Sequence, residues 1–192
     1  MNYGSTTTTD GQPLIAPKVL AGLRVKDNKL ISFDFSKDQN GNTVTNRVTI
    51  TFEQSNGYHF SVSFLDSDQS WAIEKLNRDI LHICSKIVSA DEYNTIVSGS
   101  TNFVDFMTRV RDKIMIPNYG KMFNLKITYG KPNKLSGRSY AGFPNIPQYI
   151  EPADTADENT LFKDDPRYDF YTPVTPVATT APTATSEEEP LF

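Results

Sequence analysis

Cationic and aromatic side chains alternate along residues 121–149. The stretch holds five Lys or Arg residues and five aromatic rings, in the order Lys121, Phe123, Lys126, Tyr129, Lys131, Lys134, Arg138, Tyr140, Phe143 and Tyr149. Cations of this kind can contact phosphates while rings stack on bases, and each stacked base contributes about 1–3 kcal/mol to binding. The alternation therefore predicts a non-covalent site for a single-stranded polynucleotide.

Three cations on earlier segments complete the candidate DNA-binding residues. The full set is Arg24, Lys26, Arg47, Lys126, Tyr129, Lys131, Lys134, Arg138, Tyr140 and Phe143. Strand parity predicts that Lys126 faces solvent, and it leaves Tyr129 between the core and the surface. Prolines and Gly142 interrupt the chain around Tyr140 and Phe143, which favours surface positions for both rings. We expect the set to converge on a cationic trough lined by rings.

Residues that perform catalysis or bind metals are sparse. His59 and His82 are the only histidines, and the surrounding patterns favour a structural or solvent-facing role for each. No Gly-x-Ser-x-Gly sequence, Gly-rich phosphate loop or Cys/His metal spacing occurs. Asp66 and Asp68 stand where a helix begins, and capping accounts for them. We therefore expect no catalytic residue, metal or cofactor, and predict a binding protein rather than an enzyme.

Charge is divided unevenly along the chain. The net charge is −4, but residues 1–150 carry +4 and residues 151–192 carry −8. A basic body and an acidic tail attract each other, so the tail could fill a cationic trough until a polyanion displaces it. Acidic tails also occur simply because they keep a chain soluble, and charge alone does not separate these two interpretations.

The cysteine count and hydropathy bear on the compartment. Cys84 is the only cysteine, which rules out an internal disulfide and suits a reducing cytoplasm. No run of about 18 apolar residues occurs, so we expect no membrane span. Residues 1–10 lack the basic start and the apolar stretch of a secretory signal.

Alternation of period two predicts strands in the first third of the chain. It marks residues 19–35, 47–52 and 58–64. Asp27-Asn28 is expected to form a turn inside the first of these stretches. Asn56-Gly57 separates the other two, and we expect a hairpin turn in which both residues take positive φ.

A helical pattern then interrupts the strands. Spacings of three and four predict three helices within residues 70–116, the second of which opens with a capping box from Ser89 to Glu92. Period two returns over residues 122–129. Residues 139–150 are interrupted by prolines, which is typical of an edge strand or an extended segment.

This order of elements predicts a mainly β fold with a helical insert, in the α+β class, and an OB-type antiparallel barrel. A β-sandwich with a helical excursion is the competing architecture, and strand counting does not separate the two. We expect a flexible arm over residues 1–17, one domain over 18–151 with its insert at 70–116, and a disordered acidic tail over 152–192. A cluster of rings at 161–171 could dock on the body or on a partner.

The chain ends in Glu187, Glu188, Glu189, Pro190, Leu191 and Phe192. This ending resembles the C-terminal tip of single-stranded DNA-binding proteins, in which an acidic run precedes an aliphatic residue, a proline and a terminal Phe. Phage replication members of the family have an acidic tail that ends in Phe. Here the proline and the aliphatic residue are exchanged relative to the bacterial order. The stretch from Phe123 to Tyr129, followed by 140–150, is similar to the closing strands of phage-type members.

The resemblance implies an OB-fold body that binds single-stranded DNA without sequence specificity during replication, recombination or repair. It also implies that residues 187–192 recruit replication or repair proteins, and that a phage-encoded chain would act in the host cytoplasm. Formation of a homo-oligomer is compatible with this resemblance. The alternative is a phage virion structural or assembly protein with a β-domain and extended tails, because the Thr-rich start and the Pro-rich end suit that role as well.

Overall fold

The computed structural model describes residues 19–135, 137–145 and 148–171. The strands are β1 (Gly22–Lys37), β2 (Thr43–Glu53), β3 (His59–Leu65), β4 (Met122–Tyr129), β5 (Ala141–Gly142) and β6 (Ile150–Pro152). The α-helices are α1 (Ser70–Cys84), α2 (Ala90–Val97) and α3 (Phe103–Val110). Shorter helical turns cover Arg111–Met115, Ile116–Asn118 and Asp157–Asn159. The expected helical insert at 70–116 is confirmed.

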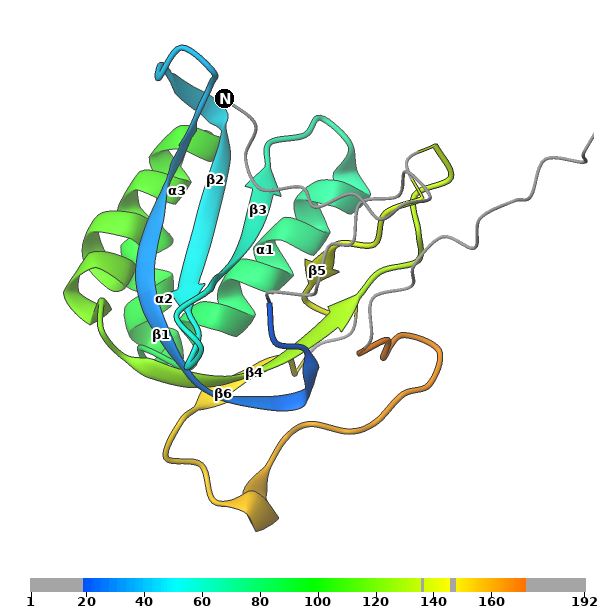
Figure 1. Ribbon diagram of the computed structural model, residues 1–192. Helices are drawn as coiled ribbons and strands as arrows, with labels where there is room; N and C mark the ends of the chain where they lie inside the picture. Colours follow the sequence, from blue (N-terminus) through cyan, green and yellow to red (C-terminus); the bar gives the residue numbers. More distant parts are fainter. Residues whose placement is uncertain (1–18, 136, 146–147, 172–192) are drawn as a thin grey trace, which may run out of the picture.

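The strands form one antiparallel sheet in the order β3-β2-β1-β4-β5, with β6 also paired to β4. The long strand β1 pairs with β2 along its second half and with β4 along its first half. Register shifts in both pairings let β1 bend. Because β3 also comes close to β5, the sheet curls into a half-barrel (Figure 1). This mainly β architecture is compatible with an OB-like barrel.

The predicted turn at Asp27-Asn28 is wrong, because β1 runs through it without reversing. Asp27 takes a φ of 58°, which disturbs the strand locally. The buried Asn28 amide group then donates to the carbonyl oxygens of Val25, at 2.7 Å, and Phe123, at 3.1 Å. The irregularity therefore helps β1 to change partners from β4 to β2.

The predicted hairpin at Asn56-Gly57 is confirmed, although its turn differs from the expected one. Residues 54–58 connect β2 to β3, and the backbone N–H of Gln54 donates to the carbonyl oxygen of Tyr58 at 2.9 Å. Gly57 has a φ of 78°, and Asn56 does not take a positive φ. The connection over residues 54–58 is longer than the expected two-residue turn, and in it only Gly57 needs the left-handed conformation.

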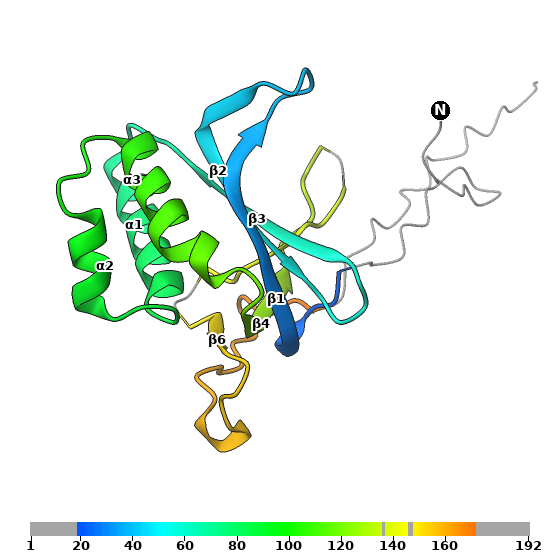
Figure 2. The same cartoon turned by 90° about the vertical axis from the view of Figure 1, so that its left-hand side faces the viewer.

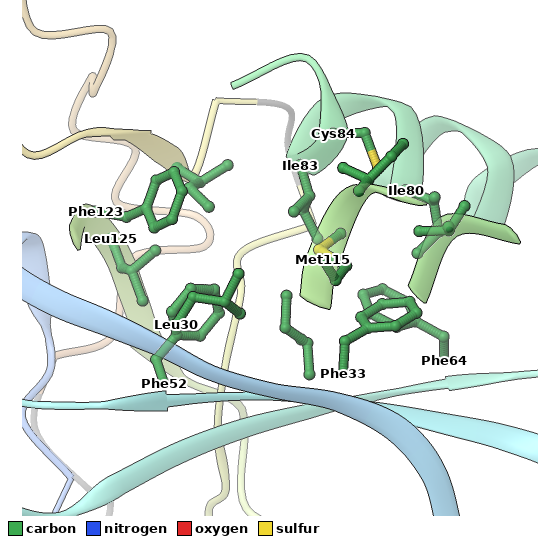
Figure 3. Packing of buried hydrophobic residues seen from close by; sticks show 14 of the residues in the cluster. Leu30, Phe33, Phe52, Phe64, Ile80, Ile83, Cys84, Met115, Phe123 and Leu125 are labelled. Atoms are coloured by element: carbon green, nitrogen blue, oxygen red, sulfur yellow. The ribbon is translucent and has the colours of Figure 1, made fainter. Parts of the chain in front are cut away.

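The three helices lie together on one side of the β1–β2–β3 sheet (Figure 2). The predicted capping box is borne out in part, since the Ser89 side chain accepts a hydrogen bond from the backbone N–H of Glu92 at 3.2 Å. Helix side chains such as Ile80 and Ile83 pack against sheet residues such as Phe33 in a continuous apolar core (Figure 3). Cys84 is fully buried in this core.

Residues 153–171, which we call the C-terminal strap, run beneath β4 and return to its far end (Figure 1). The Arg24 side chain donates to the carbonyl oxygen of Thr155 at 2.6 Å, and the backbone N–H of Tyr129 donates to the carbonyl oxygen of Phe170. The folded body therefore extends past the expected boundary at 151. The expected arm over 1–17 and the remaining tail lie outside the described residues.

Candidate nucleic-acid interface

The connection between β4 and β5 carries the densest group of exposed cations expected to bind DNA. We call residues 130–135 and 137–140 the basic loop. Lys131, Lys134 and Arg138 are all exposed there. Hydrogen bonds from Gly130 N–H to the carbonyl oxygen of Tyr140, at 3.1 Å, and from Asn133 N–H to that of Arg138, at 2.9 Å, hold the loop as an extension of the hairpin.

Tyr140 presents its ring beside these cations. Its side chain is 65% exposed, so the expectation that this ring lies on the surface is confirmed. Among the described residues, Lys131 and Lys134 have no carboxylate within ion-pair distance, so their charges remain available to an anion. The three cations and the ring on the basic loop form the part of the expected trough that the structure brings together.

Arg47 lies on the outward face of β2, where its side chain is exposed. The next outward positions along β2, Thr49 and Thr51, carry hydroxyl groups. Thr49 bonds to Ser36 at 2.9 Å and to Ser63 at 3.0 Å, while Thr51 bonds to Ser61 at 3.0 Å. These hydroxyl groups can offer hydrogen bonds to phosphate oxygens.

Lys126 does not face solvent as strand parity predicted. Its side chain is fully buried, and its ammonium group lies 2.7 Å from the carboxylate of Asp169, which is also fully buried. It also donates to the carbonyl oxygen of Lys163. The strap covers this face of β4, and a buried charge of this kind needs such partners. Lys126 is therefore part of the interior.

The ring of Tyr129 is buried as well, and that of Phe143 is half-buried. Tyr129 is 6% exposed, and its hydroxyl donates to the carbonyl oxygen of Val19 at 3.1 Å. Phe143 packs on the core, with its ring stacked on Tyr149 at 4.3 Å and edge-on to Phe60 at 5.2 Å. The surface position expected for Phe143 is confirmed only in part, because the half-buried ring packs where β5 approaches β3 and also lines an open hollow.

Arg24 and Lys26 are engaged by acidic residues of the C-terminal segment. Arg24 Nε lies 2.7 Å from buried Glu151, and its Nη1 contacts Asp157. Lys26 Nζ lies 3.1 Å from Asp157, and this hydrogen bond is the first cause of the lowered pKa of Asp157, followed by the positive charges of Lys26 and Arg24. These two cations hold the acidic segment in place rather than line a trough with the basic loop.

An open hollow of about 290 Å³ lies between the basic loop and the strap. Lys131 lines one side, and Arg167, Tyr168 and Phe170 line the other. The sequence reasoning did not include Arg167 or Tyr168 among the site residues. The cluster of rings at 161–171 was the signal that could have found them, but it did not show on which surface the cluster docks.

The remaining expectations concern residues and features beyond this surface. The predicted partner-binding tip, residues 187–192, lies outside the described residues. Within the described ranges, none of the helices has the length and apolar character needed to cross a bilayer. In that same part of the chain, no three His, Cys, Asp or Glu side chains gather as a metal site.

Comparison with known proteins adds no further assignment. No protein-family model matches the chain, and no curated protein sequence matches it either.

Proposed function

We propose that this protein binds single-stranded DNA without sequence specificity, in an OB-type body, during DNA replication, recombination or repair. The observation that carries the proposal is the exposed basic loop, with Lys131, Lys134, Arg138 and Tyr140. The outward face of β2 and β3 adds hydroxyl groups. The proposed role is binding rather than catalysis.

The arrangement of the strands supports this location. OB-folds bind oligonucleotides on the face of their second and third strands and on the loops that join strands 1–2 and 4–5. The counterparts here are the outward face of β2 and β3, residues 38–42, and the basic loop. The exposed cations of the basic loop therefore lie on a connection that this type of barrel uses for nucleic acid.

The chemistry of this surface supports binding without sequence preference. Lysine and arginine side chains contact phosphates, which are the same at every nucleotide. The exposed ring of Tyr140 can stack on any base, because every base has a π-face. Neither kind of contact reads the hydrogen-bonding edge of a base.

The last six residues of the chain resemble the C-terminal tip of single-stranded DNA-binding proteins. This resemblance supports a proposal that residues 187–192 recruit replication or repair proteins in the cytoplasm.

The proposal is tested by titrating the full chain into fluorescent oligo-dT at several salt concentrations. We expect affinity to fall steeply with salt, and Lys131→Gln/Lys134→Gln to reduce the logarithmic salt slope by about 1.4, or about 0.7 for each lost phosphate contact on a single strand. The control is Lys113→Gln/Lys121→Gln, which removes two exposed charges away from the basic loop. Absence of binding to oligo-dT at low salt would contradict the proposal.

A further inference from the structure

The hollow beside the basic loop has walls from two parts of the chain that are distant in sequence. Lys131 and Gly130 follow β4, whereas Arg167 and Tyr168 belong to the C-terminal strap. The side chain of Arg167 is 77% exposed, and Tyr168 is 40% exposed. The two strap residues are therefore accessible from solvent while they border the same space as an exposed cation of the basic loop.

The strap is fixed at the point where it forms this wall. The buried ion pair between Lys126 and Asp169 and the backbone hydrogen bond from Tyr129 to Phe170 attach it to β4. Within the strap, the backbone N–H groups of Tyr168 and Asp169 both donate to the carbonyl oxygen of Asp165 at 2.9 Å. Arg167 and Tyr168 thus project from a closed turn that is anchored in the interior.

The side chains of Arg167 and Tyr168 together form a flat surface, and the charge of Arg167 is paired within the strap. Arg167 Nε and Nη2 lie 3.0 Å and 2.8 Å from the two carboxylate oxygens of Asp165. The same guanidinium group lies over the Tyr168 ring, 5.4 Å from its centroid. Because Asp165 offsets its charge and holds its plane, Arg167 is better suited to stacking than to phosphate contact. Lys131 opposite keeps its charge for a phosphate.

We infer that the Arg167–Tyr168 platform is a base-stacking subsite for single-stranded DNA, and that the strap is the second wall of the binding site. The inference rests on the proposed function and adds a specific nucleotide contact to it. A base would stack on the platform while its phosphate reaches Lys131. The Lys126–Asp169 pair acts as a positioning pair, because it holds the platform without touching the DNA.

The test compares two ligands with equal numbers of phosphates: a short oligo-dT and an abasic oligonucleotide of the same length. We expect Tyr168→Ala to weaken binding to oligo-dT about tenfold and to leave binding to the abasic strand nearly unchanged. Tyr168→Phe, which keeps the ring, should bind oligo-dT like the unchanged protein. Leu81→Ala, which truncates a side chain that is 42% exposed on α1, is the control for loss of exposed apolar surface.

The outcomes separate this inference from the proposed function. If Tyr168→Ala leaves oligo-dT binding unchanged while Lys131→Gln/Lys134→Gln weakens it, the subsite is wrong and the proposed function stands. Equal weakening toward both ligands would also overturn the stacking role. If the unchanged protein binds neither strand at low salt, the proposed function itself fails. Near-ultraviolet circular dichroism of each variant checks that its fold is retained.

Discussion

Lys126 and Asp169 form an ion pair of 2.7 Å in which neither side chain is exposed. The pair joins β4 to the end of the C-terminal strap. Residues 151–171 contain seven of the ten acidic residues found in 151–192. Arg24, Lys26 and Lys126 are already paired with acids of that stretch. Most of the acidic charge expected in a displaceable tail thus belongs to the folded body.

Breaking the Lys126–Asp169 pair should destabilise the protein strongly. Lys126→Met leaves the Asp169 carboxylate buried without its counter-charge, and loss of one partner of such a pair costs about 3–5 kcal/mol. Asp169 Oδ2 also accepts a hydrogen bond from the backbone N–H of Asp165 at 2.6 Å. Lys126→Met/Asp169→Asn should therefore recover most of the loss, because Asn keeps an oxygen for that N–H. Urea unfolding measures each change in the free energy of unfolding.

An exposed pair provides the control for this measurement. Lys29 and Glu53 lie 3.7 Å apart with both side chains largely in solvent, so Glu53→Gln should change the free energy of unfolding by less than about 1 kcal/mol. Equal effects of Glu53→Gln and Lys126→Met would show that burial of the Lys126 charge has no energetic consequence and would contradict the prediction.

Deletion of residues 187–192 should not weaken binding to single-stranded DNA. The three glutamates of the tip repel phosphates and can compete with them for Lys131 and Lys134, so their removal should tighten binding at low salt. The gain should shrink as salt screens the charges. Glu187→Gln/Glu188→Gln/Glu189→Gln is the matched variant, because it removes the charge and keeps Pro190, Leu191 and Phe192. Weaker DNA binding after either change would contradict the competition.

Local patterns in the sequence predicted much of the fold because they depend on neighbouring residues. The helical insert, the hairpin at Gly57 and the Ser89 cap all follow from periodicity or from turn and cap chemistry. The bend in β1 could not be predicted in the same way. Asp27-Asn28 has the composition of a turn, but Asn28 finds a hydrogen-bond partner at Phe123, on a strand that is distant in sequence.

The candidate site was harder to predict, because exposure depends on what covers a strand. The alternation of side chains along β4 correctly separates the two faces of the strand, but the strap covers the face that carries Lys126. Phe143 is half-buried because β5 closes on β3. The burial of Lys126 and of Phe143 depends on contacts between segments that are distant in sequence. The period-two pattern of side chains along one strand carries no information about such contacts. Tyr140, on the basic loop, is 65% exposed as expected.

Gly57→Ala should destabilise the β2–β3 hairpin by about 1–2 kcal/mol. Gly57 has a φ of 78°, which is unfavourable for a residue with a Cβ atom. A Cβ atom at this position would meet no other atom within 4 Å, so the cost comes from the backbone conformation alone. Gly142→Ala is the matched control, since it also has open space and no positive φ. Similar melting temperatures for the two variants would contradict the prediction.

His82 should make the stability of the protein depend on pH in the weakly acidic range. Its Nε2 accepts a hydrogen bond from the backbone N–H of Gln148 at 3.1 Å, and its ring lies 4.8 Å from that of Tyr149. Burial first, and then the positive charge of Lys86, lower the pKa of His82 from 6.5 to about 4. The neutral ring is therefore the form that the folded protein favours.

The direction in which stability changes with pH follows from the lowered pKa of His82. The unfolded chain takes up a proton on His82 near pH 6.5, whereas the folded protein resists it until about pH 4. The contribution of His82 is thus complete above pH 6.5 and is lost as the pH falls toward 4, with a size of roughly 1–2 kcal/mol after allowance for partial exposure. Urea midpoints between pH 7.5 and 4.5 should fall less in His82→Gln than in the unchanged protein. His59→Gln, at an exposed position, should retain the full decrease, and a constant difference between His82→Gln and the unchanged protein across this range would refute the assignment.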